Sequence, residues 1–230
     1  MPAGLALLGV IVLTGLGIWQ LERRVWKLDL IEKVEQRVHA APVAAPGPSS
    51  WSHLDAYRRV DVRGRFLSAP QTLVRAVTER GAGYWVIVPF RAQEGFTVLV
   101  NRGFIPADAA AQDLPNASGG EVVLTGLLRL TEPGGGFLRH NDPANERWYS
   151  RDVDAIAAAR GIGSAAPYFI DVDASGDPSA LPVGGLTVIA FANNHLVYAL
   201  TWFGLAAMLA GWLAVFVRQE LRLGKPGGIR

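Results

Sequence analysis

The stretch NNHLVYALTWFGLAAMLAGWLAVFV, residues 193–217, contains no charged residue, yet it begins with two asparagines and a histidine. The uncharged, mostly apolar run from Leu196 to Val217 is 22 residues long. At about 1.5 Å per residue such a helix spans roughly 33 Å, enough to cross a hydrocarbon core of about 30 Å. A helix buried in a soluble protein rarely stays apolar on every side for that length. We therefore predict a transmembrane helix over 195–217.

A second uncharged stretch covers residues 3–21. Its four glycines are compatible with a transmembrane helix, in which glycine is more frequent than in soluble helices. A cleaved signal peptide is the alternative, but no basic residue precedes the stretch and no small-residue cleavage site follows closely. We expect an uncleaved first transmembrane helix. A juxtamembrane helix over 22–38 should continue it, because apolar residues recur there every three or four positions.

The basic residues give conflicting predictions for orientation. Four of them lie in the tail over 218–230 and place the C-terminus in the cytoplasm. With two spans, the N-terminus is then also cytoplasmic and the intervening domain lies outside. However, Arg23, Arg24 and Lys27 directly follow the first helix and by themselves indicate the opposite orientation.

The residues between the two helices divide into a linker and a folded domain. The linker over 39–50 is interpreted as a spacer, because its prolines, glycine and serines cannot sustain a helix. Residues 51–192 are predicted to be mainly β, because apolar residues alternate or cluster there in short runs. The expected strands are YRRVDVRGRF (57–66), QTLVRAVT (71–78), YWVIVPF (84–90), FTVLVNRG (96–103), EVVLTGLLRL (121–130), PYFIDVD (167–173) and LTVIAF (186–191).

Shorter signals predict the turns and one soluble helix of this domain. AQEG (92–95) is expected to connect a hairpin, and TEPGGG (131–136) to be a flexible loop. DVDAIAAARG (152–161) predicts a helix with Asp152 as its N-cap and Gly161 at its end. The predicted fold class is an α+β membrane protein, in which two antiparallel transmembrane helices flank a mainly-β, barrel- or sandwich-like extracytoplasmic domain with one short helix.

Composition excludes several kinds of site. The chain has no cysteine, which excludes disulfides, zinc–thiolate sites and iron–sulfur clusters, and its net charge of +2 gives no argument for nucleic acid. It also lacks a nucleophile elbow, a phosphate loop and a dinucleotide fingerprint. Solvated loop, cap or surface roles are expected for Asp142, Glu146, Asp152, Asp154, His39, His53 and His140. We therefore expect no enzymatic activity.

The two ends of the predicted helix pair that face the domain are more informative. Two spans joined by one external domain must be antiparallel, so the end of the first helix lies level with the start of the second. His195, Tyr198 and Trp202 are spaced to share one helical face. The residues expected at the same depth on the first helix are Trp19, Gln20, Arg23 and Arg24. The small residues expected to let the helices approach closely are Ala206, Ala207, Ala210 and Gly211.

An imidazole, several aromatic rings and two guanidiniums around an apolar cleft would suit an amphipathic anionic ligand. Haem fits this description, with its iron on the imidazole and its propionates on the arginines, and so does a quinone or a lipid headgroup. The alternative is that these residues form only an interfacial belt, in which Trp, Tyr and Arg are normally enriched.

Eight blocks of the sequence, in order, resemble the surfeit-locus family of cytochrome c oxidase assembly factors. They are LGIWQLERRVWK, YRRVDVRGRF, GYWVIVPF, VLVNRGFIP, WYSRDVDAIA, PYFIDVD, PVGGLTV and NNHLVYALTWFGLA. The first and last blocks are the most specific, and the resemblance covers about Leu16 to Ala206. One departure is Phe104 in VNRGFIP (100–106), where the family usually has tryptophan. From the residues alone, this stretch is interpreted as a strand that ends in a turn, with Asn101 and Arg102 either capping the turn or contacting a partner.

The resemblance implies an assembly factor that aids insertion of haem a into the catalytic subunit of the oxidase. It also implies a two-span protein with an external domain, which settles the orientation conflict. His195 maps to the proposed haem ligand of the family, and Trp19 and Arg23 map to its WQLER block. Together with the geometry, this gives a predicted haem site of His195, as ligand to the iron, with Trp19, Arg23, Arg24, Tyr198 and Trp202.

The expected partners are the oxidase catalytic subunit, haem a synthase and membrane lipid, and the expected location is a bacterial inner membrane with the domain in the periplasm. This location rests in part on the lack of a mitochondrial-type presequence before the first span. Two alternatives remain. One is a haem-free chaperone that docks the nascent oxidase subunit through its β domain, by means of an apolar surface near Phe104. The other is a quinone or lipid sensor.

Overall fold

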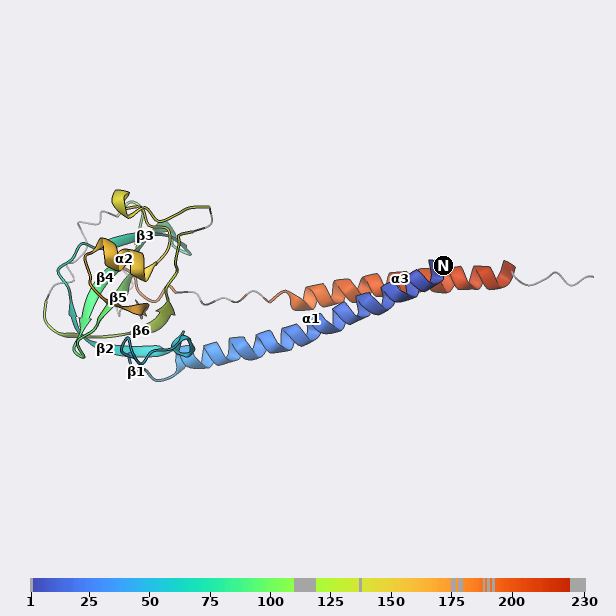
Figure 1. Cartoon of the computed structure of the whole chain (residues 1–230), viewed down its shortest axis with the longest axis horizontal. Coiled ribbons are helices and arrows are strands. Elements are labelled where there is room, and N and C mark those ends of the chain that lie inside the picture. The colour runs from blue at the N-terminus through green and yellow to red at the C-terminus, as the bar shows by residue number, and fades with distance from the viewer. Residues whose placement is uncertain are drawn as a thin grey trace, which may run out of the picture. The chain divides into compact units, whose positions relative to one another are not determined.

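The computed structural model divides into two compact units, a helix unit (Met1–Lys33 with Ala190–Arg230) and a β unit (Val34–Ile189) (Figure 1). The residues that the structure describes are 2–109, 119–136, 138–174, 177, 180–187, 189, 191 and 193–223. The tail from 224 onward and two positions of LTVIAF, 188 and 190, lie outside them.

The helix unit consists of two long apolar helices. The first, α1 (Pro2–His39), is one unbroken helix of 38 residues, so the juxtamembrane helix continues the first predicted span directly, as expected. The second, α3, covers His195–Leu223. Both are long and apolar enough to cross a membrane. They lie side by side and antiparallel (Figure 1), since Gly9 of α1 is next to Leu209 and Gly17 is next to Phe203.

The helices approach through small residues, but these are mostly not the predicted ones. On α3, Ala199 and Ala206 are buried against α1, whereas the predicted Ala207, Ala210 and Gly211 are exposed. The other small residues at the helix contact are on α1, where Gly9 and Gly17 leave room for side chains of α3. The sequence prediction considered only the small residues of the second helix, and it therefore missed the glycines that face them.

The β unit contains a closed barrel. Its strands are β1 (Val43–Ala44), β2 (Arg59–Phe66), β3 (Thr72–Thr78), β4 (Gly81–Ala92), β5 (Thr97–Pro106), β6 (Val122–Leu130) and β7 (Ala165–Val172). The sheet order is β1-β2-β6-β7-β5-β4-β3, and β2 also pairs with β4. This extra pairing closes β2, β6, β7, β5 and β4 into a ring and leaves β1 and β3 outside it. The ladder of β5 and β7 is parallel, and the other ladders of the ring are antiparallel. The β-barrel alternative is therefore confirmed.

Alternating side chains fill the barrel, as expected for strands with one face inward. The interior cluster is made of Val60, Val62, Phe90, Ala92, Val98, Val100, Leu128, Ala166, Tyr168 and Ile170. A second buried cluster lies under the short helix α2 (Val153–Ala159) and includes Trp148, Ile156 and Phe169. Asp152 caps α2 by accepting a hydrogen bond from the N–H of Ala155, and Gly161 follows its end with φ +67°, both as predicted.

Two predicted loops are held more firmly than expected. The 39–50 stretch is docked on the barrel, because β1 pairs in parallel with β2 and the Tyr168 hydroxyl donates to the Pro46 carbonyl. The TEPGGG loop is also fixed, since the Gly134 N–H donates to Asp152 and the Gly135 N–H donates to Ser150. Neither stretch is a plain spacer in this structure.

The predictions for two stretches of the domain, VNRGFIP (100–106) and LTVIAF (186–191), need correction. VNRGFIP does not turn, because β5 continues to Pro106. Gly103 makes this possible by adopting φ +133°, and the adjacent Phe104 exchanges backbone hydrogen bonds with Val183. The LTVIAF stretch is not a strand at Leu186 or Thr187, which lie in irregular structure, and its remaining described positions, 189 and 191, are likewise irregular.

Candidate functional site

The site suggested by the sequence lies where α3 begins. His195 is the first residue of α3, and the Gln20 side chain is buried on α1. The Nδ1 atom of His195 and the Oε1 atom of Gln20 are 2.7 Å apart and form a hydrogen bond. Antiparallel packing brings these two residues level. The polar start of α3 therefore has a specific partner on the other helix.

This hydrogen bond sets the chemistry of the imidazole. An amide oxygen can only accept, so Nδ1 carries a proton in this arrangement, and in the neutral imidazole Nε2 then keeps its lone pair. Within the described residues, no hydrogen bond to Nε2 of His195 is formed. A histidine whose one nitrogen donates to an oxygen while the other is free has the arrangement of most metal-bound histidines.

Two other polar atoms of the helix unit are buried without a hydrogen-bond partner. In the described part of the chain, Trp202 Nε1 and Asn193 Oδ1 are in this state. Trp202 lies about two turns along α3 from His195, and Asn193 lies two residues before it. Because buried polar atoms in native proteins are nearly always hydrogen-bonded, these two are available to a ligand or to water.

The other predicted site residues lie around this pair rather than against it. Trp19 is 51% exposed and Tyr198 is 55% exposed, so both project from the helix pair. The Arg23 guanidinium lies 4.3 Å from the centre of the Trp26 ring, and Arg24 is half-buried. No observation tests a ligand role for any of them, and these roles stay predictions.

Lys27 is a cation that the sequence did not assign to the site. Its Nζ atom lies 5.2 Å from the centre of the Phe191 ring, just before α3. Its spacing of three and four residues from Arg24 and Arg23 on α1 could have indicated it.

The donor set fits a haem. His195 offers an imidazole nitrogen with a free lone pair, and its other nitrogen is already hydrogen-bonded to Gln20. Indole rings and guanidiniums, which suit a macrocycle and its propionates, occur on the same stretches of α1 and α3. The buried unpartnered Trp202 Nε1 and Asn193 Oδ1 add polar groups that a bound molecule could satisfy.

A second polar cluster lies in the β unit, on the side of β7 that faces away from the barrel interior. Asp171 on β7 has a side chain only 2% exposed, and it accepts hydrogen bonds from Arg129 at 2.9 Å and from Arg151 at 3.2 Å. Asn101 and Thr187 also donate to Asp171, at 2.8 and 2.9 Å. Asn101 also makes the local contact expected of a cap, since its Oδ1 accepts a hydrogen bond from the Gly103 N–H at 3.1 Å, but β5 continues here without a turn. Its amide group additionally joins the Asp171 cluster.

The charges of this cluster compensate each other. Arg151 also pairs with Glu132, and its guanidinium lies over the ring of Phe169 at 4.7 Å. Burial opposes ionisation of Glu132, but the hydrogen bonds and charge of Arg151 outweigh it and hold the pKa of Glu132 below its usual value. Burial likewise opposes the charge on Arg151, but Asp171 and Glu132 together raise its pKa. Since every charge has a partner, we interpret this cluster as structural.

The remaining candidate side chains have structural or surface positions. Asp142 and Asp152 cap short helices, Glu146 pairs with Arg160 at 2.6 Å, and Asp154 is exposed. His39, His53 and His140 are exposed. In the described ranges, no group of three or more His, Cys, Asp or Glu side chains could hold a metal ion.

Phe104 does not contribute to a surface. It is fully buried in the barrel wall, and its ring meets that of Trp85 edge-on at 5.9 Å. The apolar docking surface expected near this residue is therefore not formed by its side chain.

Two long apolar helices that flank a closed β-barrel in the sequence define the class of protein, and comparisons with known proteins give its family. The model of the SURF1 family matches residues 7–207. Surfeit locus protein 1 of rat is 38% identical over 225 residues, which cover 89% of this chain and 72% of the rat protein. The human protein of the same name is also 38% identical, over 93% of this chain and 75% of its own length. A SURF1-like protein of Monosiga brevicollis is 40% identical, over 94% of this chain and 87% of its own length.

The chain belongs to the SURF1 family. The match covers α1 from Leu7 onward, the whole barrel and the first part of α3 to Ala207, including both partners of the Gln20–His195 hydrogen bond. It confirms the resemblance that the sequence blocks indicated.

Proposed function

We propose that this protein is a non-catalytic assembly factor for cytochrome c oxidase that holds haem a and aids its insertion into the catalytic subunit. Membership of the SURF1 family supports the oxidase as the system served. The observation that carries the haem proposal is the Gln20–His195 hydrogen bond, which leaves Nε2 of a histidine free at the polar end of an apolar helix pair.

Each residue of the proposed site has a distinct task. His195 would offer Nε2 to the haem iron, and Gln20 would hold the ring by its Nδ1 proton. Arg23 and Arg24 would pair with propionates, for which guanidinium geometry is well suited. The aromatic side chains proposed to line the macrocycle are Trp19, Tyr198 and Trp202.

The haem is cargo in this proposal, so the site must release it. A single protein ligand and exposed aromatic neighbours suit a holding site better than a closed pocket would. Trp19 and Tyr198, each about half exposed, would cover the haem only from its edges. The proposed partners are the oxidase catalytic subunit, which receives the haem, haem a synthase, which supplies it, and membrane lipid.

We further propose that α1 and α3 span a bacterial inner membrane, with the barrel in the periplasm and both termini in the cytoplasm. The length and apolar character of both helices support insertion. Because the chain has no cysteine, single cysteines can report the orientation. Leu54→Cys, which is exposed in the β unit, should react with a membrane-impermeant maleimide in intact cells, and Arg218→Cys should react only after lysis. The reverse pattern would overturn the orientation.

The haem proposal is tested by the absorption spectrum of the full chain, purified from cells that make haem a. We expect a haem spectrum and a bound haem in the parent protein, and a loss of at least tenfold in haem affinity for His195→Ala. His140→Ala, at an exposed histidine of the β unit, is the matched control and should bind haem like the parent. Unchanged haem content and spectrum in His195→Ala would show that His195 is not the ligand.

A further inference from the structure

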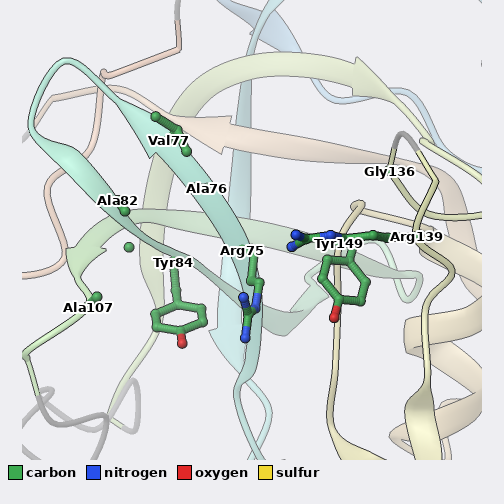
Figure 2. A pocket seen from close by; sticks show the side chains of 10 residues that line it. Arg75, Ala76, Val77, Ala82, Tyr84, Ala107, Gly136, Arg139 and Tyr149 are labelled. Atoms are coloured by element: carbon green, nitrogen blue, oxygen red, sulfur yellow. The ribbon is translucent and has the colours of Figure 1, made fainter.

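A cavity of about 320 Å³ lies over the β3–β4 hairpin, between Ala107 on one side and Gly136, Arg139 and Tyr149 on the other (Figure 2). Its charged side chains are two arginines, Arg75 and Arg139, and its aromatic ones are Tyr84 and Tyr149. The remaining lining residues are alanines, glycines and Val77. No acidic residue lines the cavity in the part of the chain that the structure describes.

The two guanidiniums share one aromatic ring. Arg75 Cζ lies 5.6 Å from the centre of the Tyr149 ring, and Arg139 Cζ lies 5.4 Å from it. In Figure 2 the side chains of Arg75, Arg139 and Tyr149 gather together. Among the described residues neither arginine forms an ion pair, whereas Arg129, Arg151 and Arg160 of the same unit all do. Two neighbouring cations without a counterion favour an anionic ligand.

The backbone beside these arginines is a strand edge that is only partly paired. β3 is the last strand in the sheet order, with β4 on its inner side. On its outer side Val74 forms an isolated parallel bridge with Trp148, which leaves the edge open beyond Arg75. The N–H of Arg75 points away from β4, because it donates to the carbonyl of Trp148 at 2.9 Å. Since backbone direction alternates along a strand, the N–H and C=O of Val77 point the same way. Within the described ranges, neither of these two groups of Val77 has a hydrogen-bond partner.

The side chain of Val77 strengthens the case for an interaction surface. It is 85% exposed, the second most exposed large apolar side chain in the described residues after Leu138. An edge strand whose backbone groups are open and which carries no proline can serve as a template for another strand. Here the template lies next to an unpaired positive charge, which selects for acidic sequences.

We propose that the outer edge of β3 binds an extended acidic segment of a partner polypeptide. The segment adds a strand at Val77 through backbone hydrogen bonds, and its carboxylates pair with Arg75 and Arg139. An apolar residue between the carboxylates covers the exposed Val77 side chain. This surface lies wholly in the β unit, and the proposal does not depend on haem binding.

The test measures binding of a fluorescein-labelled peptide of alternating Glu and Val to the full chain in detergent, by fluorescence anisotropy. The same peptide with Gln in place of Glu is the ligand control. We expect Arg75→Gln and Arg139→Gln each to weaken binding about tenfold. Arg63→Gln, at an exposed β2 arginine that pairs with no carboxylate among the described residues, should leave binding unchanged. Equal binding of the Gln peptide, or no effect of either cavity arginine, would overturn the proposal.

A second variant tests the strand addition separately. Val77→Pro removes only an N–H that points to solvent, and proline is tolerated at such edge positions, so the barrel should stay folded. We expect Val77→Pro to weaken binding of the peptide as much as the loss of one arginine does. If Val77→Pro binds the peptide like the parent, or if succinate displaces the peptide at a concentration equal to the peptide Kd, the cavity is a simple anion site and strand addition is wrong.

Discussion

The Oε1 atom of Gln20 and the Nδ1 atom of His195 are 2.7 Å apart, although 175 residues separate them in the chain. The bond joins the two long helices at one level and fixes which nitrogen of the imidazole carries the proton. It therefore gives a glutamine inside an apolar helix pair a role that its position in the sequence did not show.

Gln20→Met should weaken haem binding about 10–100-fold, because it removes the acceptor that orients the His195 ring. Gln20→Glu keeps an oxygen in reach of Nδ1 and should retain most of the affinity. Haem titration followed by absorbance separates the two variants. Equal affinities for both would show that the hydrogen bond does not support ligation.

Gly17→Val should disturb the helix pair. A Cβ atom at Gly17 would lie 2.5 Å from the Phe203 ring, so a branched side chain must push the helices apart at a cost of about 1–3 kcal/mol. Gly15→Val is the matched control, because a Cβ there meets nothing within 4 Å. The helix distance can be followed by cross-linking Gln20→Cys with His195→Cys, since the chain has no other cysteine. Slower cross-linking is expected with Gly17→Val and not with Gly15→Val.

Asp171→Asn should destabilise the barrel by about 3–5 kcal/mol, because it removes the buried carboxylate that two largely covered arginines share. Asp173→Asn is a useful comparison two residues further on. Asp173 pairs with Arg59, and both side chains are about one-third exposed. The free energy of unfolding should therefore fall by only about 0–1 kcal/mol in Asp173→Asn. Chemical denaturation of the full chain, followed by near-UV circular dichroism, measures both. Similar losses in the two variants would contradict the buried character of the cluster.

Acid should destabilise the barrel in part through Glu132. Its folded pKa lies below the usual 4.5, despite burial, because Arg151 stabilises the carboxylate. Stability from this group is therefore present above about pH 4.5 and is lost as the pH falls through the folded pKa. Glu132→Gln should lower Tm at neutral pH and make Tm less sensitive to acid. Glu121→Gln, at an exposed carboxylate, should keep the acid dependence of the parent.

The sequence predicted most of the barrel, because its strands carry clear alternation. The β2 stretch has apolar residues at Val60 and Val62, and both are buried. The short helix was also predicted, because Asp152 and Gly161 are local signals that need no tertiary partner. Such signals depend on backbone preference and on one buried face, which a single sequence shows directly.

The errors share a different cause, which is contact between distant segments. The linker around Pro46 is proline-rich and lacks a local pattern, but it is docked because Tyr168 and β2 offer it hydrogen bonds. Asn101 precedes Gly103 by two residues and so favoured a turn, yet the contacts of Asn101 with Asp171 and of Phe104 with Val183 hold the chain extended there. In the candidate site, antiparallel packing of the two helices predicted that Gln20 lies level with His195. The hydrogen bond that distinguishes Gln20 from its neighbours on α1 is visible only in the folded structure.

The order of strands in the ring has a consequence for synthesis on the ribosome. β7 is the last strand to be made, but it lies between β5 and β6, which are made earlier. Until Val172 has left the exit tunnel, both of these strands have an unpaired edge, and such edges are prone to aggregate. The nascent chain must therefore hold an open, incomplete barrel while α1 is already made, and a stop codon anywhere before β7 would leave it permanently open.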